Sequence, residues 1–152
     1  MAAASPTVHA SAVLAGVRAV LIRGPSASGK SRLTLELIEA AQAGLVRFAL
    51  LVGDDRVHLE AVNGRLLVRP AETLAGLIEV RGLGLVRLSY EPVAVVGLVV
   101  DLAAADAQRL PQTIARTAEI DGVELPRLAV AAGATALPQV LSLLKSCPDR
   151  LL

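Results

Sequence analysis

Residues 24–31 read GPSASGKS, and the segments on either side of this loop limit the folds open to the chain. The apolar run 19–22 precedes the loop, and apolar residues at helical spacing follow it over 33–41. A glycine-rich loop between a strand and a helix points backbone N–H groups and a helix N-terminus at one place, where they bind phosphate. The sequence therefore predicts an α/β core that binds a nucleotide.

Two residues of this loop have separate expected tasks. The Lys30 ammonium reaches the β- and γ-phosphates, and the Ser31 hydroxyl binds Mg²⁺. The loop residues expected to surround the nucleotide phosphates are Gly24, Pro25, Ser26, Ala27, Ser28, Gly29, Lys30 and Ser31.

Hydrophobic patterns place further elements along the chain. Asn63-Gly64 is a two-residue hairpin signal between two of the expected strands. We expect a flexible end at residues 1–7 and a single domain over 8–152. Strands are expected at 9–14, 19–22, 48–52, 56–60, 65–69, 78–80, 85–88, 93–102 and 123–130, and helices at 31–43, 71–76, 104–117 (broken by Pro111) and 137–145.

Composition narrows the classes of partner. The 152 residues carry 15 Lys and Arg against 14 Asp and Glu, without a basic stripe, which argues against nucleic acid as the main ligand. No run approaches the roughly 20 apolar residues of a membrane span. Cys147 is the one cysteine, so an internal disulfide is impossible and a cytoplasmic location is expected.

Acidic residues follow two of the apolar strands. Asp54 and Asp55 come directly after 48–52, and Asp101 lies near the end of 93–102. An acid at the end of a buried strand beside a phosphate loop binds Mg²⁺ or orients the attacking hydroxyl. The pattern does not rank these two positions.

Four segments taken in order, HASAVLAG, GPSASGKS, LVGDDRV and IEVRGLGLV, resemble the HPr kinase/phosphorylase family. The likeness extends over about residues 8–102, and the chain is similar to the short, alphaproteobacterial form that has only the C-terminal catalytic domain. The resemblance implies a P-loop core of the HPr kinase/phosphoenolpyruvate carboxykinase-like type, a mixed sheet with flanking helices. It also implies ATP and Mg²⁺ as cofactors and a cytoplasmic homo-oligomer, a hexamer in long relatives.

The activity implied by the resemblance is phosphorylation of a serine of HPr, the carrier protein of the sugar phosphotransferase system, with phosphorolysis as the reverse reaction. By the same resemblance the catalytic residues are His9, Lys30, Asp54, Asp55 and, as the nearest match to a family arginine, Arg109. The metal positions are Ser31 and Glu79. The segment matched to the family's substrate loop is Glu79, Val80, Arg81, Gly82, Leu83 and Gly84.

The sequence departs from the family in two places. Residues 125–135, LPRLAVAAGAT, lack the paired arginines that the family uses for dephosphorylation. The sequence therefore leaves open whether this chain also catalyses phosphorolysis. Gly53 stands where alanine is usual before the acidic pair. A small-molecule P-loop kinase and a non-catalytic nucleotide-sensing module are the two alternatives.

Overall fold

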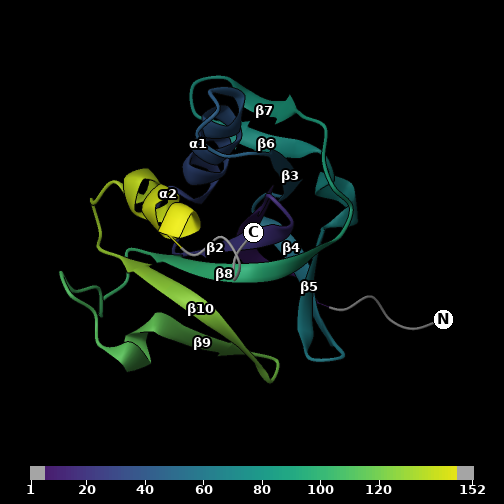
Figure 1. Cartoon of the computed structure of the whole chain (residues 1–152). Coiled ribbons are helices and arrows are strands. Elements are labelled where there is room, and N and C mark those ends of the chain that lie inside the picture. The colour runs from purple at the N-terminus through teal and green to yellow at the C-terminus, as the bar shows by residue number, and fades with distance from the viewer. Residues whose placement is uncertain (1–5, 147–152) are drawn as a thin grey trace.

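The chain forms a mixed β-sheet with two helices on one face and a separate two-stranded hairpin (Figure 1). The computed structural model describes residues 6–146. The elements in chain order are β1 (Val8–Ala15), β2 (Arg18–Arg23), α1 (Lys30–Gln42), β3 (Ala49–Gly53), β4 (Arg56–Val62), β5 (Arg65–Pro70), the 3₁₀ turn η1 (Glu72–Leu74), β6 (Leu77–Val80), β7 (Gly84–Arg87), β8 (Ala94–Leu102), the 3₁₀ turn η2 (Thr113–Arg116), β9 (Thr117–Ile120), β10 (Val123–Val130) and α2 (Ala136–Ser146).

The strand, loop and helix expected around GPSASGKS are present. β1 and β2 form an antiparallel hairpin, β2 ends at Arg23, and α1 begins at Lys30. Leu33, Leu37 and Ala40 recur every three to four residues, so they share the helix face that is buried against the sheet.

Five strands close into a ring, which no local pattern predicted. β1 pairs with β2 and, through its first residues, with β4. β4 pairs with β5, β5 with the start of β8, and β8 with β2. β3 adds to β1, β10 to β8, and β9 to β10.

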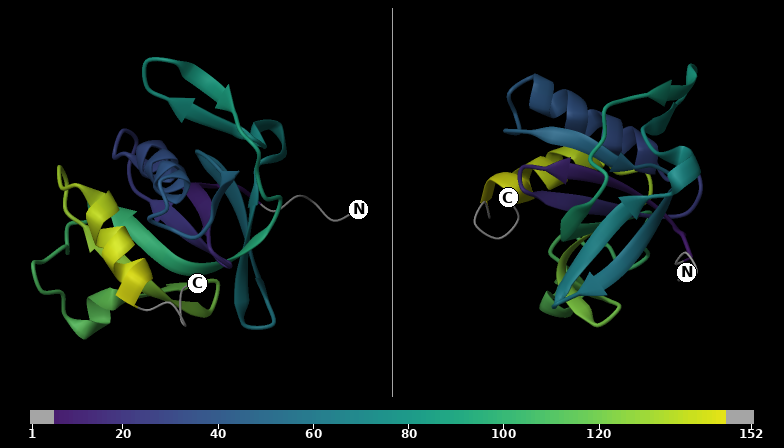
Figure 2. Two further views of the ribbon diagram at one scale, coloured as in Figure 1. Left: turned by 45° about the horizontal axis from the view of Figure 1, so that its top comes forward. Right: turned by 90° about the vertical axis from the view of Figure 1, so that its right-hand side faces the viewer.

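Two apolar cores lie on opposite faces of the central strands, because successive side chains of a strand alternate. Ile22 and Val100 pack with α1 and α2, whereas Leu21 and Val99 face the interior of the ring with residues of β4 and β5. The two further views in Figure 2 show the helices on one side of these strands.

The strand directions bring several loops to one edge of the sheet. β2, β8 and β10 run parallel, so their carboxyl ends meet there. β3 also ends at this edge and β1 begins there, because both β2 and β3 are antiparallel to β1. In sheets of this kind ligands bind beyond the carboxyl ends of the strands.

The structure corrects the expected helix over 104–117. That segment contains only the turn η2, and Thr117 begins β9, which pairs with β10 across Asp121-Gly122. The expected helix at 71–76 is a single 3₁₀ turn, η1. Pro111 disfavours a continuous helix, and the ladder with β10 stabilises the extended form.

Most of the flexible end expected at residues 1–7 lies outside the described residues, and so does Cys147. Within residues 6–146, neither helix has the length and apolar character needed to cross a membrane.

Candidate active site

The phosphate loop between β2 and α1 contains residues with a left-handed backbone conformation. Gly29, the residue before the helix, has φ 102°, a conformation that side chains other than glycine rarely adopt. Ala27 has φ 64° although it is not glycine. Turns with alternating handedness direct successive N–H groups inward and make an anion-binding concavity, at the positive end of α1.

Lys30 is folded over this loop. Its Nζ donates to the carbonyl oxygens of Gly24 at 2.8 Å and of Pro25 at 3.0 Å, and the residue is 7% exposed. Burial lowers the pKa of Lys30 below its ordinary value, against the opposing effect of the negative charges of Asp55 and Asp54. The ammonium group thus stands at the loop with both acids near enough to act on it.

Asp54 is buried, with 3% of its surface exposed, and three groups donate to its carboxylate. They are the Ser11 hydroxyl at 2.6 Å, the Ser31 hydroxyl at 2.8 Å and the Glu79 backbone N–H at 3.1 Å. The acid at the end of β3 is therefore in direct contact with the hydroxyl that the loop motif assigns to the metal ion.

Asp55 is far more exposed than its neighbour Asp54. Its φ is 69°, its side chain is 61% exposed, and His9 Nε2 lies 3.0 Å from its Oδ1. Asp55 and His9 both line a cleft that also contains residues 25–31 of the phosphate loop. The sequence-predicted histidine and acidic pair are thus brought together around the phosphate loop.

Close packing of neighbouring strands explains why glycine stands at position 53. A Cβ built at this position would come within 2.8 Å of Val57 Cγ1 and 3.0 Å of Pro70 Cα, so β4 and β5 leave no room for alanine. The departure from the family pattern at Gly53 is explained by the close approach of these strands, and the acids after it keep their places.

Asp101, the rival magnesium position, is held in ion pairs. Arg23 Nε lies 2.7 Å from its Oδ1, and Arg127 Nε bonds its other oxygen. Burial opposes ionisation, but the hydrogen bonds and charges of Arg23 and Arg127 outweigh it and hold the pKa of Asp101 below its ordinary value. Both oxygens of Asp101 are thus paired with arginines, whereas the Asp54 carboxylate contacts the Ser31 hydroxyl of the phosphate loop, so the geometry favours Asp54 for the metal.

Arg127 extends this network to the connection after β8. It also bonds both carboxylate oxygens of Asp106 and the Ala115 carbonyl. The hydrogen bonds and charges of Asp106 and Asp101, chiefly the bonds to Asp106, raise the pKa of Arg127 against the effect of burial. Arg109, expected to be catalytic, is exposed on the same connection and does not line the cleft. The structure does not bring Arg109 to the site.

The cleft has a volume of about 1090 Å³ and runs across the phosphate loop. Glu79, Val80 and Arg81 of the β6–β7 hairpin line one side, while residues 130–136 line another. Leu83, at the tip of the hairpin, is 78% exposed. The segment expected to contact the substrate thus stands beside the acids, with its tip open to solvent.

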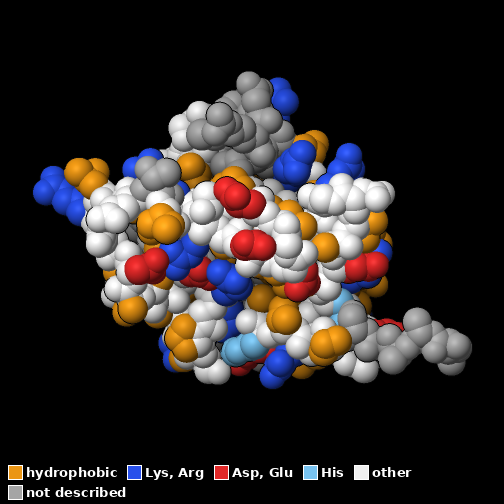
Figure 3. Space-filling model, turned by 90° about the horizontal axis from the view of Figure 1, so that it is seen from below, with side chains coloured by type: hydrophobic (Ala, Val, Ile, Leu, Met, Phe, Trp, Pro, Cys, Tyr) orange, Lys and Arg blue, Asp and Glu red, His pale blue; other side chains and the backbone are white. Residues whose placement is uncertain are grey.

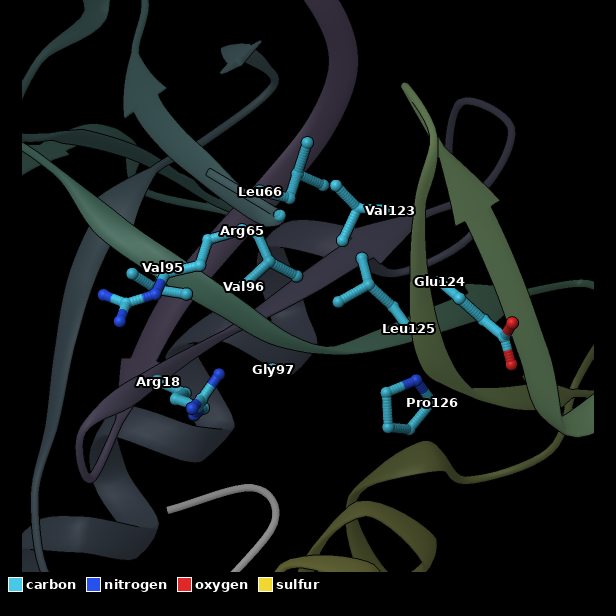
Figure 4. Close-up of a pocket in the computed structure, with 11 residues that line it drawn as sticks. Arg18, Arg65, Leu66, Val95, Val96, Gly97, Val123, Glu124, Leu125 and Pro126 are labelled. Atoms are coloured by element: carbon cyan, nitrogen blue, oxygen red, sulfur yellow. The ribbon is translucent and has the colours of Figure 1, made fainter. Parts of the chain in front are cut away.

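A second hollow of about 160 Å³ opens at the opposite edge of the sheet, between the first residues of β2, β8 and β10 (Figure 4). Arg18 and Glu124 lie on its rim, and none of the sequence-predicted site residues lines it. Residues 25–31 of the phosphate loop, Asp55 and His9 line the larger cleft, and Asp54 lies buried beside it in contact with Ser31.

The donor set suits Mg²⁺. Among residues 6–146 no group of three or more His, Cys, Asp or Glu side chains is placed to hold a metal ion alone. Mg²⁺ binds through one or two protein oxygens, with phosphate oxygens and waters completing its octahedron. The Ser31 hydroxyl and the Asp54 carboxylate supply such oxygens beside the loop, and Glu79 lies at the same side of the cleft.

Sequence reasoning missed Ser11 and Arg127. Ser11 is fully buried in β1 and contacts Asp54, and Arg127 organises the network around Asp101. The signal for Ser11 was a hydroxyl within the otherwise apolar run after His9. For Arg127 there was no local signal, because its partners come from distant strands.

Comparison with known proteins identifies a matching family. The model of the HPr Serine kinase C-terminal domain matches residues 2–135. The chain is 39% identical over 67 residues to the HPr kinase/phosphorylase of Clostridium beijerinckii, covering 44% of this chain and 20% of that protein. It is 37% identical over 83 residues to that of Mycoplasma mycoides, covering 53% and 24%. The chain thus matches only about a fifth to a quarter of the length of these curated relatives.

A solved structure supports the fold over nearly the whole chain. The HPr(Ser) kinase/phosphatase from Coxiella burnetii superposes with a TM-score of 0.75, covering 94% of this chain and 96% of that one. The two sequences are 24% identical, so the likeness speaks for the fold alone.

Proposed function

The chain belongs to the family of HPr serine kinase C-terminal domains, and we propose that it is an ATP-dependent kinase that phosphorylates a serine of HPr or an HPr-like phosphocarrier protein. The observation that carries this proposal is the division of the acidic pair. Asp54 contacts the phosphate-loop serine, while Asp55 opens with His9 into the cleft.

Each group has a task that phosphoryl transfer requires, which is mainly positioning and neutralisation of charge. The loop N–H groups and Lys30 bind the β- and γ-phosphates. Ser31 and Asp54 would hold Mg²⁺, which neutralises phosphate charge when bound. Glu79, at the same side, is the further metal residue of the proposal.

Asp55 is placed to act as the base. Its carboxylate accepts the proton of the incoming serine hydroxyl as that oxygen bonds to the γ-phosphorus and the bond to the ADP oxygen breaks. His9, 3.0 Å from Asp55 Oδ1, orients the carboxylate. Residues 79–84 would contact the HPr segment, because the hairpin forms one wall of the cleft and its tip is exposed.

The reverse reaction needs a group that binds inorganic phosphate beside phosphoserine. Arg127 is the one arginine of 125–135, and its guanidinium is already committed to Asp101, Asp106 and the Ala115 carbonyl. We therefore propose phosphorylation as the principal direction, with phosphorolysis slower.

Other features of the proposal concern the surroundings of the site. On the face shown in Figure 3 acidic and basic side chains are interspersed, so no basic stripe for nucleic acid is seen there. The cytoplasmic location and the homo-hexamer implied by the resemblance stay predictions.

The test is incubation with ATP, Mg²⁺ and purified HPr, followed by intact-mass measurement and mapping of the modified residue. One added phosphate on a serine supports the proposal. ATP binding without transfer to HPr would favour the nucleotide-sensing alternative, and ATP turnover only with a small acceptor would favour a small-molecule kinase.

Asp54→Asn and Asp55→Asn should each lower the rate of serine phosphorylation by at least ~100-fold, while binding of ATP without metal survives. Asp121→Asn is the matched control, because Asp121 also has a left-handed φ of 50° but lies in the β9–β10 turn. Near-normal transfer by both site variants would refute the assigned roles.

A further inference from the structure

We propose that Ser11, in β1, is a positioning residue that holds Asp54 and Asp55 in place through hydrogen bonds. The proposal rests on the proposed function for its meaning, since the pair matters only if the site transfers phosphate. Its structural part, the hold on Asp54 and Asp55, is measurable without any kinase activity.

The Ser11 side chain hydrogen-bonds to both acidic residues. Its hydroxyl donates to Asp54 Oδ1 at 2.6 Å and accepts the backbone N–H of Asp55 at 3.3 Å. The residue is 0% exposed and does not line the cleft. Because no part of Ser11 is exposed and its hydroxyl is bonded to the two acidic residues, its effect on the site passes through them.

The turn after β3 needs such an anchor. Asp55 has a left-handed φ of 69°, a conformation that is uncommon for residues with a Cβ. The Asp54 carbonyl accepts from Arg56 N–H at 2.8 Å, and the Asp55 carbonyl accepts from Ala10 N–H at 3.2 Å. Ser11 accepts the N–H of Asp55 in this turn, which leaves the Asp54 carboxylate buried and the Asp55 carboxylate exposed.

The other two donors to Asp54 are less suited to this task. The Ser31 hydroxyl belongs to the phosphate loop and is the group expected to turn to a metal ion. The Glu79 N–H is carried by β6, which belongs to a two-stranded sheet outside the main one. Ser11 lies in β1, which is paired on both sides at this level, with β2 and β3.

The serine is matched to its space. Its strand neighbours Ala10 and Ala12 are both 0% exposed, so the backbone here is fixed by close packing. Ser11→Ala removes only the hydroxyl, so the Asp54 carboxylate keeps two donors, the Ser31 hydroxyl and the Glu79 N–H. Ser11→Thr keeps the hydroxyl and adds one methyl group in a strand that favours β-branched residues.

The first experiment uses the nucleotide-free protein. Amide hydrogen exchange of Asp55, measured by NMR, should accelerate about 5-fold in Ser11→Ala, the change expected for loss of one hydrogen bond of typical strength. Ser11→Thr should exchange at close to the wild-type rate.

The second experiment measures ATP affinity with Mg²⁺ and with EDTA by calorimetry. The gain in affinity due to Mg²⁺ should fall at least ~5-fold in Ser11→Ala, because the Asp54 carboxylate is no longer held toward Ser31. If HPr is phosphorylated, the turnover number should fall at least ~10-fold with KM for ATP changed far less.

Thr34→Val is the control, since the Thr34 hydroxyl is equally buried but donates to the Lys30 carbonyl and not to the acids. It should leave both Asp55 exchange and the Mg²⁺-dependent gain unchanged. Unchanged exchange or an unchanged gain in Ser11→Ala overturns the proposal, as does an equal loss in Ser11→Thr or Thr34→Val. Failure of the wild-type chain to phosphorylate HPr overturns the proposed function, while the exchange measurement still decides the hold on Asp55.

Discussion

Replacing Asp101 by asparagine should cost stability that depends on pH. The carboxylate lies at the end of β8, with Arg23 of β2 on one side and Arg127 of β10 on the other. The side chains of Asp101 and Arg127 are 14% and 13% exposed. Asparagine keeps the shape but removes the charge that both guanidinium groups face.

The loss of stability in Asp101→Asn depends on how far Arg23 and Arg127 are left without a charged partner. Removal of one partner from a buried ion pair typically costs about 3–5 kcal/mol. The cost here should lie near 2–3 kcal/mol, below the lower limit, because Arg23 is 37% exposed and Arg127 retains Asp106. With a urea m-value of about 2 kcal/mol/M, the unfolding midpoint should fall by roughly 1 M at neutral pH.

The sign of the pH dependence follows from the lowered pKa of Asp101. A carboxyl group whose folded pKa lies below its unfolded pKa stabilises the protein fully above the unfolded value, and this contribution is lost as pH falls through the folded value. Urea unfolding at pH 7 and at about pH 3 should therefore show a large difference between wild type and Asp101→Asn that shrinks at the lower pH.

A matched comparison makes the test sharp. Asp106→Asn acts on the same arginine but removes an exposed carboxylate, so its effect should be clearly smaller. An equal gap at both pH values, or no gap at neutral pH, would refute the reasoning. Asp101→Asn should also keep the Mg²⁺-dependent gain in ATP affinity that Asp54→Asn loses, and its loss would restore Asp101 as a metal ligand.

Two further predictions concern the phosphate loop. Ala27→Gly should raise the free energy of unfolding by about 0.5–1 kcal/mol, because the cost of a left-handed alanine exceeds the extra backbone entropy that glycine loses. Urea unfolding checks this, and a lower midpoint would contradict it. Lys30→Ala should lower ATP affinity and turnover together, by ~100-fold or more in turnover. Calorimetry and the mass assay measure both, and unchanged values would count against the role of Lys30.

The elements that could be predicted from the sequence are those with local signals. The β4–β5 hairpin was marked by Asn63-Gly64, and both residues have the left-handed φ, 51° and 77°, that such turns need. The same type of signal, Asp121-Gly122 with φ 50° and 80°, marked β9 and β10 but was not recognised. The expected helix over 104–117 was wrong, because Pro111 disfavours a continuous helix and Thr117 pairs with β10 as the first residue of β9.

What the sequence could not predict depends on pairing between distant strands. Asp54 and Asp101 both end apolar strands, and no local pattern separates them. The order of strands does: β3 is placed beside β1, so Asp54 meets Ser11 and Ser31, whereas β8 lies between β2 and β10, so Asp101 meets their arginines. The order of the strands therefore determines which acid is available to a metal ion.

The backbone at Asp55 then divides two chemically identical neighbours. In an extended strand, consecutive side chains point to opposite faces, and here the left-handed residue adds a turn that leaves one carboxylate buried and the other open. A buried carboxylate with fixed donors has little freedom to move and so suits a bound cation. The exposed carboxylate beside His9 can meet a hydroxyl carried by another protein. The same two residues could not divide these tasks on a regular strand, where Asp54 would keep its donors but Asp55 would lose its approach to the phosphate loop.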